Sequence, residues 1–190
     1  MRVLGISGSL RRDSLNSALL RAAGERLPAG TELIEFEGLR EIPPYDEDAE
    51  LAGTPAAVLE LRAAMRAADA VLVATPEYNH SIPGALKNAL DWASRPAGQS
   101  ALSGKPAAVI GASTGMFGAV WAQAETRKVL GALGGRVIEA ELPVARADKL
   151  LVDGHLELGP RQSEQLDELL AELLASAEEA EEFARERVAA

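Results

Sequence analysis

The stretch DAVLVAT at residues 69–75, followed by PEYNHS at 76–81 and IPGALKNALDW at 82–92, decides the fold. Its first part is a continuous apolar run of strand length, typical of a parallel strand that is buried on both faces. Its last part predicts a helix capped by Ser81, with Pro83 in the first turn. The apolar side of that helix holds Ile82, Leu86, Leu90 and Trp92. A buried strand, a polar loop and an amphipathic helix in this order predict one unit of an α/β fold.

The same alternation of strand and helix runs along the rest of the chain. We expect the remaining strands at residues 2–7, 31–36, 105–113 and 136–140. We expect the remaining helices at residues 15–27, 55–68, 119–133 and 161–188, the second of them capped by Thr54 with Pro55 in its first turn, and a long loop at 37–53. Such alternation predicts an α/β, flavodoxin-like, doubly wound five-stranded parallel sheet of order 2-1-3-4-5, with helices on both faces. We expect one domain over residues 1–190 that ends in an amphipathic helix.

Composition excludes several classes of protein. The chain has 190 residues and a formal net charge of −10, so it lacks the basic surface that binds nucleic acid or an anionic membrane. It contains no cysteine, which excludes disulfides, thiolate chemistry and iron–sulfur clusters. The two histidines have no partners at zinc-like spacing, and we predict no metal site. The N-terminus has no secretory signal and no apolar run is long enough to span a membrane, so we expect a cytoplasmic protein. The acidic residues of the C-terminal helix indicate a helix face in contact with solvent. The alternative is an acidic tail that docks to a partner.

Unusual loops follow the strands that would be neighbours at the topological switch point, where open α/β sheets bind their ligands. The loop at 8–17 precedes a helix N-terminus and carries Arg11, both of which favour an anion. Neutral donors in the same loop are Ser9, Ser14, Asn16 and Ser17. It has no dinucleotide fingerprint and no Walker lysine, which favours a mononucleotide phosphate. The rigid loop at 76–83 and the glycine-rich loop at 113–118 suit a flat heterocycle, although each loop alone is equally compatible with ordinary turn chemistry.

The segments GSLRRDSLN, PEYNHSIPGALKNALDW and GASTGMFG resemble the NADPH-dependent FMN reductase family, which has a flavodoxin-like fold and includes quinone, chromate and azo-dye reductases. The resemblance runs from Arg2 to about Ala140. It implies that the FMN phosphate is surrounded by Ser9, Arg11, Ser14, Asn16 and Ser17. It implies that the isoalloxazine ring contacts Pro76, Glu77, Tyr78 and Asn79, and that its other side is flanked by Ser113 and Gly115.

The resemblance further implies an FMN-dependent NAD(P)H oxidoreductase. Hydride from NADPH or NADH would pass through the bound flavin to a quinone, free flavin or similar small acceptor, in a ping-pong mechanism. We assign no catalytic side chain, because the flavin carries the chemistry and solvent can protonate the reduced acceptor.

Two other functions remain open from the residues alone. A small acidic FMN protein can be a flavodoxin-type electron carrier without turnover of its own. The run Gly111–Gly115 fits the G-x-S-x-G motif of serine hydrolases, with Ser113 as nucleophile. Either Asp148 or Asp153, followed by His155, then comes in the chain order of a triad.

The family often carries an Arg-Ala-Gln-Tyr-like run that contributes to subunit contacts, and here that run is replaced by Trp121-Ala122-Gln123-Ala124. Both tryptophans, Trp92 and Trp121, flank the loops assigned to the site. Tryptophan is favoured at interface hot spots, so we predict a homodimer or homotetramer. The alternative is that both tryptophans belong to the core of the monomer.

Overall fold

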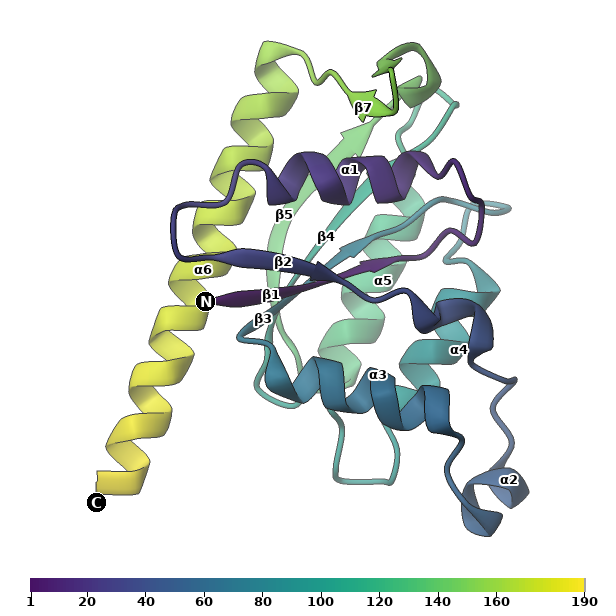
Figure 1. Ribbon diagram of the computed structural model, residues 1–190, viewed down its shortest axis with the longest axis vertical. Coiled ribbons are helices and arrows are strands. Elements are labelled where there is room, and N and C mark those ends of the chain that lie inside the picture. The colour runs from purple at the N-terminus through teal and green to yellow at the C-terminus, as the bar shows by residue number, and fades with distance from the viewer. Residues whose placement is uncertain (190) are drawn as a thin grey trace.

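The structure, a computed structural model, describes the backbone of residues 1–189 and the side chains of residues 1–186. Its main sheet has five parallel strands in the order β2-β1-β3-β4-β5, as predicted (Figure 1). The strands are β1 (Arg2–Ser7), β2 (Glu32–Glu35), β3 (Ala70–Ala74), β4 (Pro106–Ala112) and β5 (Arg136–Val144). The single-domain organisation of residues 1–190 stays a prediction.

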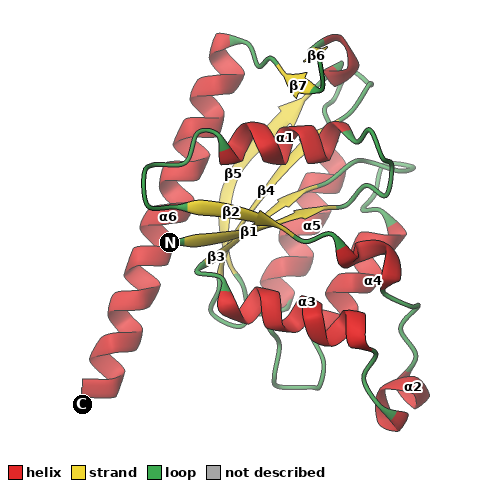
Figure 2. Ribbon diagram, viewed as in Figure 1, coloured by secondary structure: helices red, strands yellow, loops and turns green. Residues whose placement is uncertain are grey.

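Helices cover both faces of the sheet (Figure 2). One face packs against α1 (Leu15–Gly24) and α6 (Pro160–Ala189), and the other against α3 (Ala56–Ala67), α4 (Gly84–Ala93) and α5 (Val120–Ala132). Every residue of β3 and β4 is buried. Because strands enclosed between two helical layers expose neither face to water, their sequences are apolar throughout rather than alternating. The edge strand β2 alternates between exposed and half-buried residues instead.

The segment predicted as a long loop at residues 37–53 is partly helical. It contains a 3₁₀ turn, η1 (Gly38–Glu41), and the short helix α2 (Glu47–Ala52). Asp46 begins α2 because its carboxylate accepts hydrogen bonds from the backbone N–H groups of Asp48 and Ala49. The loop prediction was wrong here because the Asp46 cap was not recognised.

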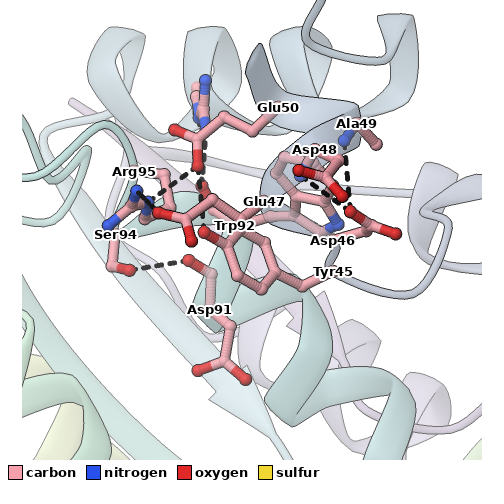
Figure 3. A network of polar contacts seen from close by, with 11 residues as sticks. Tyr45, Asp46, Glu47, Asp48, Ala49, Glu50, Asp91, Trp92, Ser94 and Arg95 are labelled. Carbon is pink, nitrogen blue, oxygen red and sulfur yellow. Dashed lines mark hydrogen bonds and ion pairs between the residues drawn. The ribbon is translucent and has the colours of Figure 1, made fainter. Parts of the chain in front are cut away.

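A polar network fixes this segment to the end of α4 (Figure 3). Glu50 accepts a hydrogen bond from the Tyr45 hydroxyl at 3.0 Å and from Arg95 Nε at 2.8 Å. Trp92 Nε1 donates to the carbonyl of Pro43 at 2.9 Å, and the rings of Tyr45 and Trp92 meet edge to face. The Arg95 hydrogen bond is the main cause that lowers the pKa of Glu50, so this carboxylate stays ionised to lower pH than an isolated glutamate.

Two predicted helix starts were wrong. The helix expected to be capped by Thr54 begins at Ala56, with Pro55 at the cap position and no side-chain cap. The helix expected to be capped by Ser81 begins at Gly84, with Pro83 at its cap position. The hydroxyl of Ser81 instead donates to Glu125 of α5, a partner distant in sequence.

Other boundaries also moved. The first helix, expected to reach residue 27, ends at Gly24. The fifth strand extends from the expected end at Ala140 to Val144, after an irregularity in its pairing with β4. A small antiparallel hairpin of β6 (Leu151–Val152) and β7 (His155–Leu156), preceded by η2 (Ala147–Lys149), was not predicted.

The expectation that both tryptophans mark an interface was wrong for Trp92. Its side chain is fully buried among the apolar residues of α3, α4 and β3. Trp121 is 40% exposed at the start of α5, so it is still available for a contact between subunits.

Candidate functional site

The loops after β1, β3 and β4 meet at the carboxyl edge of the sheet, where they border one cavity of about 140 Å³. Of the residues predicted for the flavin, those that line it are Ser9, Arg11, Ser14, Asn16, Pro76, Glu77, Tyr78 and Ser113. The lining also includes Leu15, Ala112 and Thr114, which the sequence analysis did not single out. The predicted residues Ser17, Asn79 and Gly115 are outside this lining. The cavity therefore brings together residues from all of the loops that the sequence singled out.

The first loop places hydrogen-bond donors at the N-terminus of α1. The Ser14 hydroxyl caps the helix by accepting from the N–H groups of Asn16 at 3.2 Å and Ser17 at 3.1 Å. Within the described part of the chain, the backbone N–H groups of Arg12, Asp13 and Ser14 have no acceptor. Free N–H groups in the loop that leads into α1, beside the exposed guanidinium of Arg11, suit a phosphate.

Asn16, expected as a neutral phosphate donor, lines the cavity and has bonding partners in β4. Its buried side chain donates from Nδ2 to the Ala112 carbonyl at 3.0 Å and accepts from the Ala112 N–H at 2.9 Å. These bonds join α1 to the last residue of β4. Asn16 thereby holds the first and third loops at a fixed separation, a contact between residues distant in sequence that the local pattern could not predict.

The second loop contains a tight turn. Backbone N–H groups of Tyr78 and Ser81 each donate to the other residue's carbonyl at 3.1 Å. Asn79 and His80 between them have φ angles of +52° and +60°. The Glu77 carboxylate reaches α5, where its Oε2 accepts from the N–H groups of Trp121 and Ala122, while its Oε1 lies 3.7 Å from His80 Nδ1 in the turn. The side chain expected to contact the flavin ring is therefore bonded to a helix N-terminus.

The third loop depends on Gly118 for its path. This residue has a φ angle of +57°, and a Cβ atom there would lie 2.4 Å from the carbonyl carbon of Pro143. Such a distance is far below van der Waals contact, so only glycine fits. Gln123 then fixes the loop to β5, because its Nε2 donates to the Gly118 carbonyl and its Oε1 accepts from Leu142 N–H.

The second and third loops, which border the cavity, also carry exposed apolar side chains. Tyr78 is 50% exposed, Met116 65% and Phe117 56%. The Trp121 ring meets Phe117 and His80 edge to face, with centroids 4.9 Å apart in both pairs. An apolar rim beside a donor-rich pocket suits a ligand with an anionic end and a flat ring.

A larger hollow of about 580 Å³ lies at the opposite, amino edge of the sheet, lined by Met1, Arg2, Gly30, Thr31, Glu32, Ala67 and Asp69. Two of its charged residues, Arg2 and Glu32, already pair with each other at 3.3 Å. The unpaired donors of the loop before α1 lie at the carboxyl edge of the sheet and not at this hollow.

The cavity does not contain the other members of a serine hydrolase triad. Its lining within the described residues includes Ser113 but none of Asp148, Asp153 and His155. His155 is exposed on the β6–β7 hairpin, with Nδ1 3.6 Å from Glu25.

The described residues also contain no group of three or more carboxylate and histidine side chains that could hold a metal ion. In the same part of the chain, no helix combines the length and hydropathy that crossing a bilayer requires.

An open five-stranded parallel sheet of order 2-1-3-4-5, with helices on both faces, defines the chain as a flavodoxin-like protein. Its residues 1–149 match the family model described as NADPH-dependent FMN reductase. An NAD(P)H-dependent FMN reductase of Pseudomonas aeruginosa is 54% identical over 130 residues, which cover 68% of this chain and 69% of that protein. A quinone reductase of Escherichia coli is 40% identical over 131 residues, covering 68% and 69% of the two chains.

A solved structure of a related flavoenzyme supports the same family. FerB, a flavoenzyme NAD(P)H:(acceptor) oxidoreductase from Paracoccus denitrificans, superposes with a TM-score of 0.81 at 36% identity over 94% of this chain and 98% of its own. The chain belongs to the NADPH-dependent FMN reductase family. It is thus an oxidoreductase that works with FMN and NAD(P)H, which confirms the predicted fold, family and cofactors. The family match ends at residue 149, so α6 lies outside it.

Proposed function

We propose that the chain transfers hydride from NAD(P)H to a quinone or a similar flat small-molecule acceptor with ping-pong kinetics, while its FMN stays bound. The observation that carries this proposal is the single cavity where the donor-rich end of the first loop faces the rigid segment Pro76–Tyr78. Similarity to a quinone reductase and to an NAD(P)H:(acceptor) oxidoreductase supports the choice of acceptor.

The residues at the cavity fit FMN. Among the lining residues, the Arg11 guanidinium and the unpaired Ser14 N–H offer donors for a phosphate, and the free N–H groups of Arg12 and Asp13 lie between them in the chain. The backbone of Pro76 and Tyr78 and the hydroxyl of Ser113 border the rest of the cavity, where the ring would be held. FMN supplies the capacity to accept and release hydride when bound.

The chain's own groups would bind the flavin phosphate and orient the two substrates over the ring. The helix dipole of α1 and the Arg11 charge attract the phosphate. The apolar rim of Tyr78, Met116 and Phe117 offers a surface on which a flat acceptor can replace the nicotinamide. NAD(P)H and the acceptor would use this one surface in turn, and ping-pong kinetics follow from that alternation.

The test combines a spectrum with steady-state kinetics. The purified protein reconstituted with FMN should show flavin absorbance, bleach when NAD(P)H is added without air, and recover when a benzoquinone is added. Initial rates at varied NAD(P)H and quinone should give parallel double-reciprocal lines. Intersecting lines would refute the ping-pong mechanism. Bleaching by NAD(P)H without multiple turnovers on quinone or free flavin would instead favour the flavodoxin-type carrier.

We also propose that the chain assembles as a homodimer or homotetramer through the rim beside the cavity. Trp121 is 40% exposed there, in contact with the rings of Phe117 and His80, and it begins the run that replaces the family's subunit-contact residues. Aromatic residues gathered on one exposed face are typical of an interface. A cytoplasmic location likewise stays a prediction.

A further inference from the structure

The turn at Tyr78–Ser81 has a left-handed backbone conformation at its two central residues. Asn79 and His80, neither of them glycine, both lie in the left-handed region at φ angles of +52° and +60°. Asparagine and histidine adopt this region more readily than most residues with a Cβ atom, and the two backbone hydrogen bonds between Tyr78 and Ser81 close the turn locally, so its position on the protein depends on the contacts around it. The contacts that hold this turn therefore decide the shape of the cavity wall beside it.

Both ends of the turn are bonded to the same helix through carboxylates. Before the turn, Glu77 Oε2 accepts from the N–H groups of Trp121 at 3.0 Å and Ala122 at 3.2 Å, so the loop caps α5. After the turn, Glu125 accepts from the Ser81 hydroxyl and from the Ile82 N–H at 3.3 Å. One carboxylate reaches from the loop to the helix and the other from the helix to the loop. We call this pair, Glu77 and Glu125, the carboxylate clamp.

The two carboxylates differ in exposure. The Glu77 side chain is 13% exposed, and the Glu125 residue is exposed on α5. A hydrogen bond to a shielded carboxylate is weakened less by water, so Glu77 should hold its end more firmly. The edge-to-face contact of His80 with Trp121 adds a third attachment between the turn and α5.

The clamp acts directly beside the cavity. Pro76, Glu77 and Tyr78 line it, and Tyr78 begins the turn. A turn released from α5 would be free to shift as a unit, and the Tyr78 backbone would leave its place in the wall. Only the fraction of molecules with the turn in place would then bind the flavin with full affinity.

We propose that Glu77 and Glu125 are positioning residues, which hold the Tyr78–Ser81 turn in the shape that receives the flavin ring. The proposal rests on the proposed function, since it assigns this wall of the cavity to the ring. It differs from the role first expected of Glu77, because the carboxylate acts on α5 and not on the flavin. Glu125 was not among the residues expected at the site.

The first experiment measures the turn without flavin. In apo protein, Glu125→Ala and Glu77→Ala should speed hydrogen exchange at the N–H groups of Tyr78 and Ser81. A matched control is Glu60→Ala, because Glu60 is an exposed helical glutamate that forms no hydrogen bond or ion pair among the described residues. Exchange rates that match this control would overturn the clamp. Unchanged circular dichroism identifies variants that keep the fold.

The second experiment measures FMN and riboflavin binding to the same variants by fluorescence titration. If the turn of a variant has its binding shape in about a tenth of the molecules, that variant should bind both flavins about tenfold more weakly. Glu77→Gln should restore part of the loss, because its carboxamide oxygen still accepts from α5. Arg11→Ala is the control for the other end of the ligand, since it should weaken FMN and spare riboflavin, which has no phosphate.

These outcomes separate the two proposals. Faster exchange with unchanged flavin binding would overturn the positioning role, and so would a loss confined to FMN. If Glu125→Ala fails to fold, Ser81→Ala removes the hydroxyl bond to Glu125 and keeps the Ile82 N–H bond, so it should give a smaller loss that is still equal for both flavins. A wild-type chain that binds neither flavin would overturn the proposed function. The exchange measurement in apo protein would still show whether the clamp holds the turn.

Discussion

Replacing Asn16 by alanine should destabilise the fold strongly. Asn16 is 2% exposed, and its amide makes both a donor bond and an acceptor bond with the backbone of Ala112. Alanine leaves that N–H and that carbonyl buried without partners. Each unsatisfied buried group costs about 1–3 kcal/mol, so the free energy of unfolding should fall by about 2–6 kcal/mol. A loss of this size is a large part of the stability of an ordinary domain.

The measurement is urea unfolding of the apo protein followed by circular dichroism. Flavin is left out because a bound ligand adds its own stabilisation to the folded state. Ser17→Ala is the matched control, since the Ser17 hydroxyl forms no hydrogen bond among the described residues, and its change should stay within about 0.5 kcal/mol. A phosphate-donor role for Asn16 predicts the reverse pattern. A loss of less than about 1 kcal/mol, combined with much weaker FMN binding, would refute the reasoning.

Further predictions concern binding, acid stability, the third loop and assembly. Arg11→Ala should weaken FMN binding by about 1.5–3 kcal/mol and leave riboflavin binding unchanged by titration calorimetry; equal losses would place Arg11 elsewhere. The Arg95 hydrogen bond lowers the pKa of Glu50 in the folded state, so its stabilisation is present above the ordinary carboxyl pKa of 4.5 and is lost as pH falls through the lowered value. Urea midpoints of wild type should therefore fall more steeply with acid than those of Glu50→Gln, and parallel profiles would contradict this. Gly118→Ala should lower the melting temperature and abolish FMN binding, because a Cβ atom would lie 2.4 Å from a backbone carbon of β5; retained binding would show that the loop adapts. Trp121→Ala should give smaller assemblies by sedimentation equilibrium with FMN retained, and a 20.0 kDa wild type at all micromolar concentrations would refute an oligomer.

Local pattern predicted most of the fold. Runs such as residues 69–75 are apolar throughout because a parallel strand between two helical layers meets side chains on both faces. Helix boundaries were less predictable. Ser81 has the chemistry of a cap, but its hydroxyl bonds to Glu125 on a distant helix, a partner that a local pattern does not contain. Asp46 did begin a helix inside an expected loop, which its position before a run of acidic residues could have indicated.

The sequence by itself determined the order of the elements, the strand order and the loops that carry the site. These depend on periodicity, on apolar runs and on motifs within short stretches of chain, and parallel strands bring their carboxyl ends to one edge. Only the tertiary structure decided what the polar side chains in those loops do. Asn16 bonds to β4 and Glu77 to α5, although both are types that could equally face a ligand. Trp92 lies in the core while Trp121 is exposed, although both flank site loops. Partners distant in sequence compete for each polar group, and that competition is resolved only when the chain has packed.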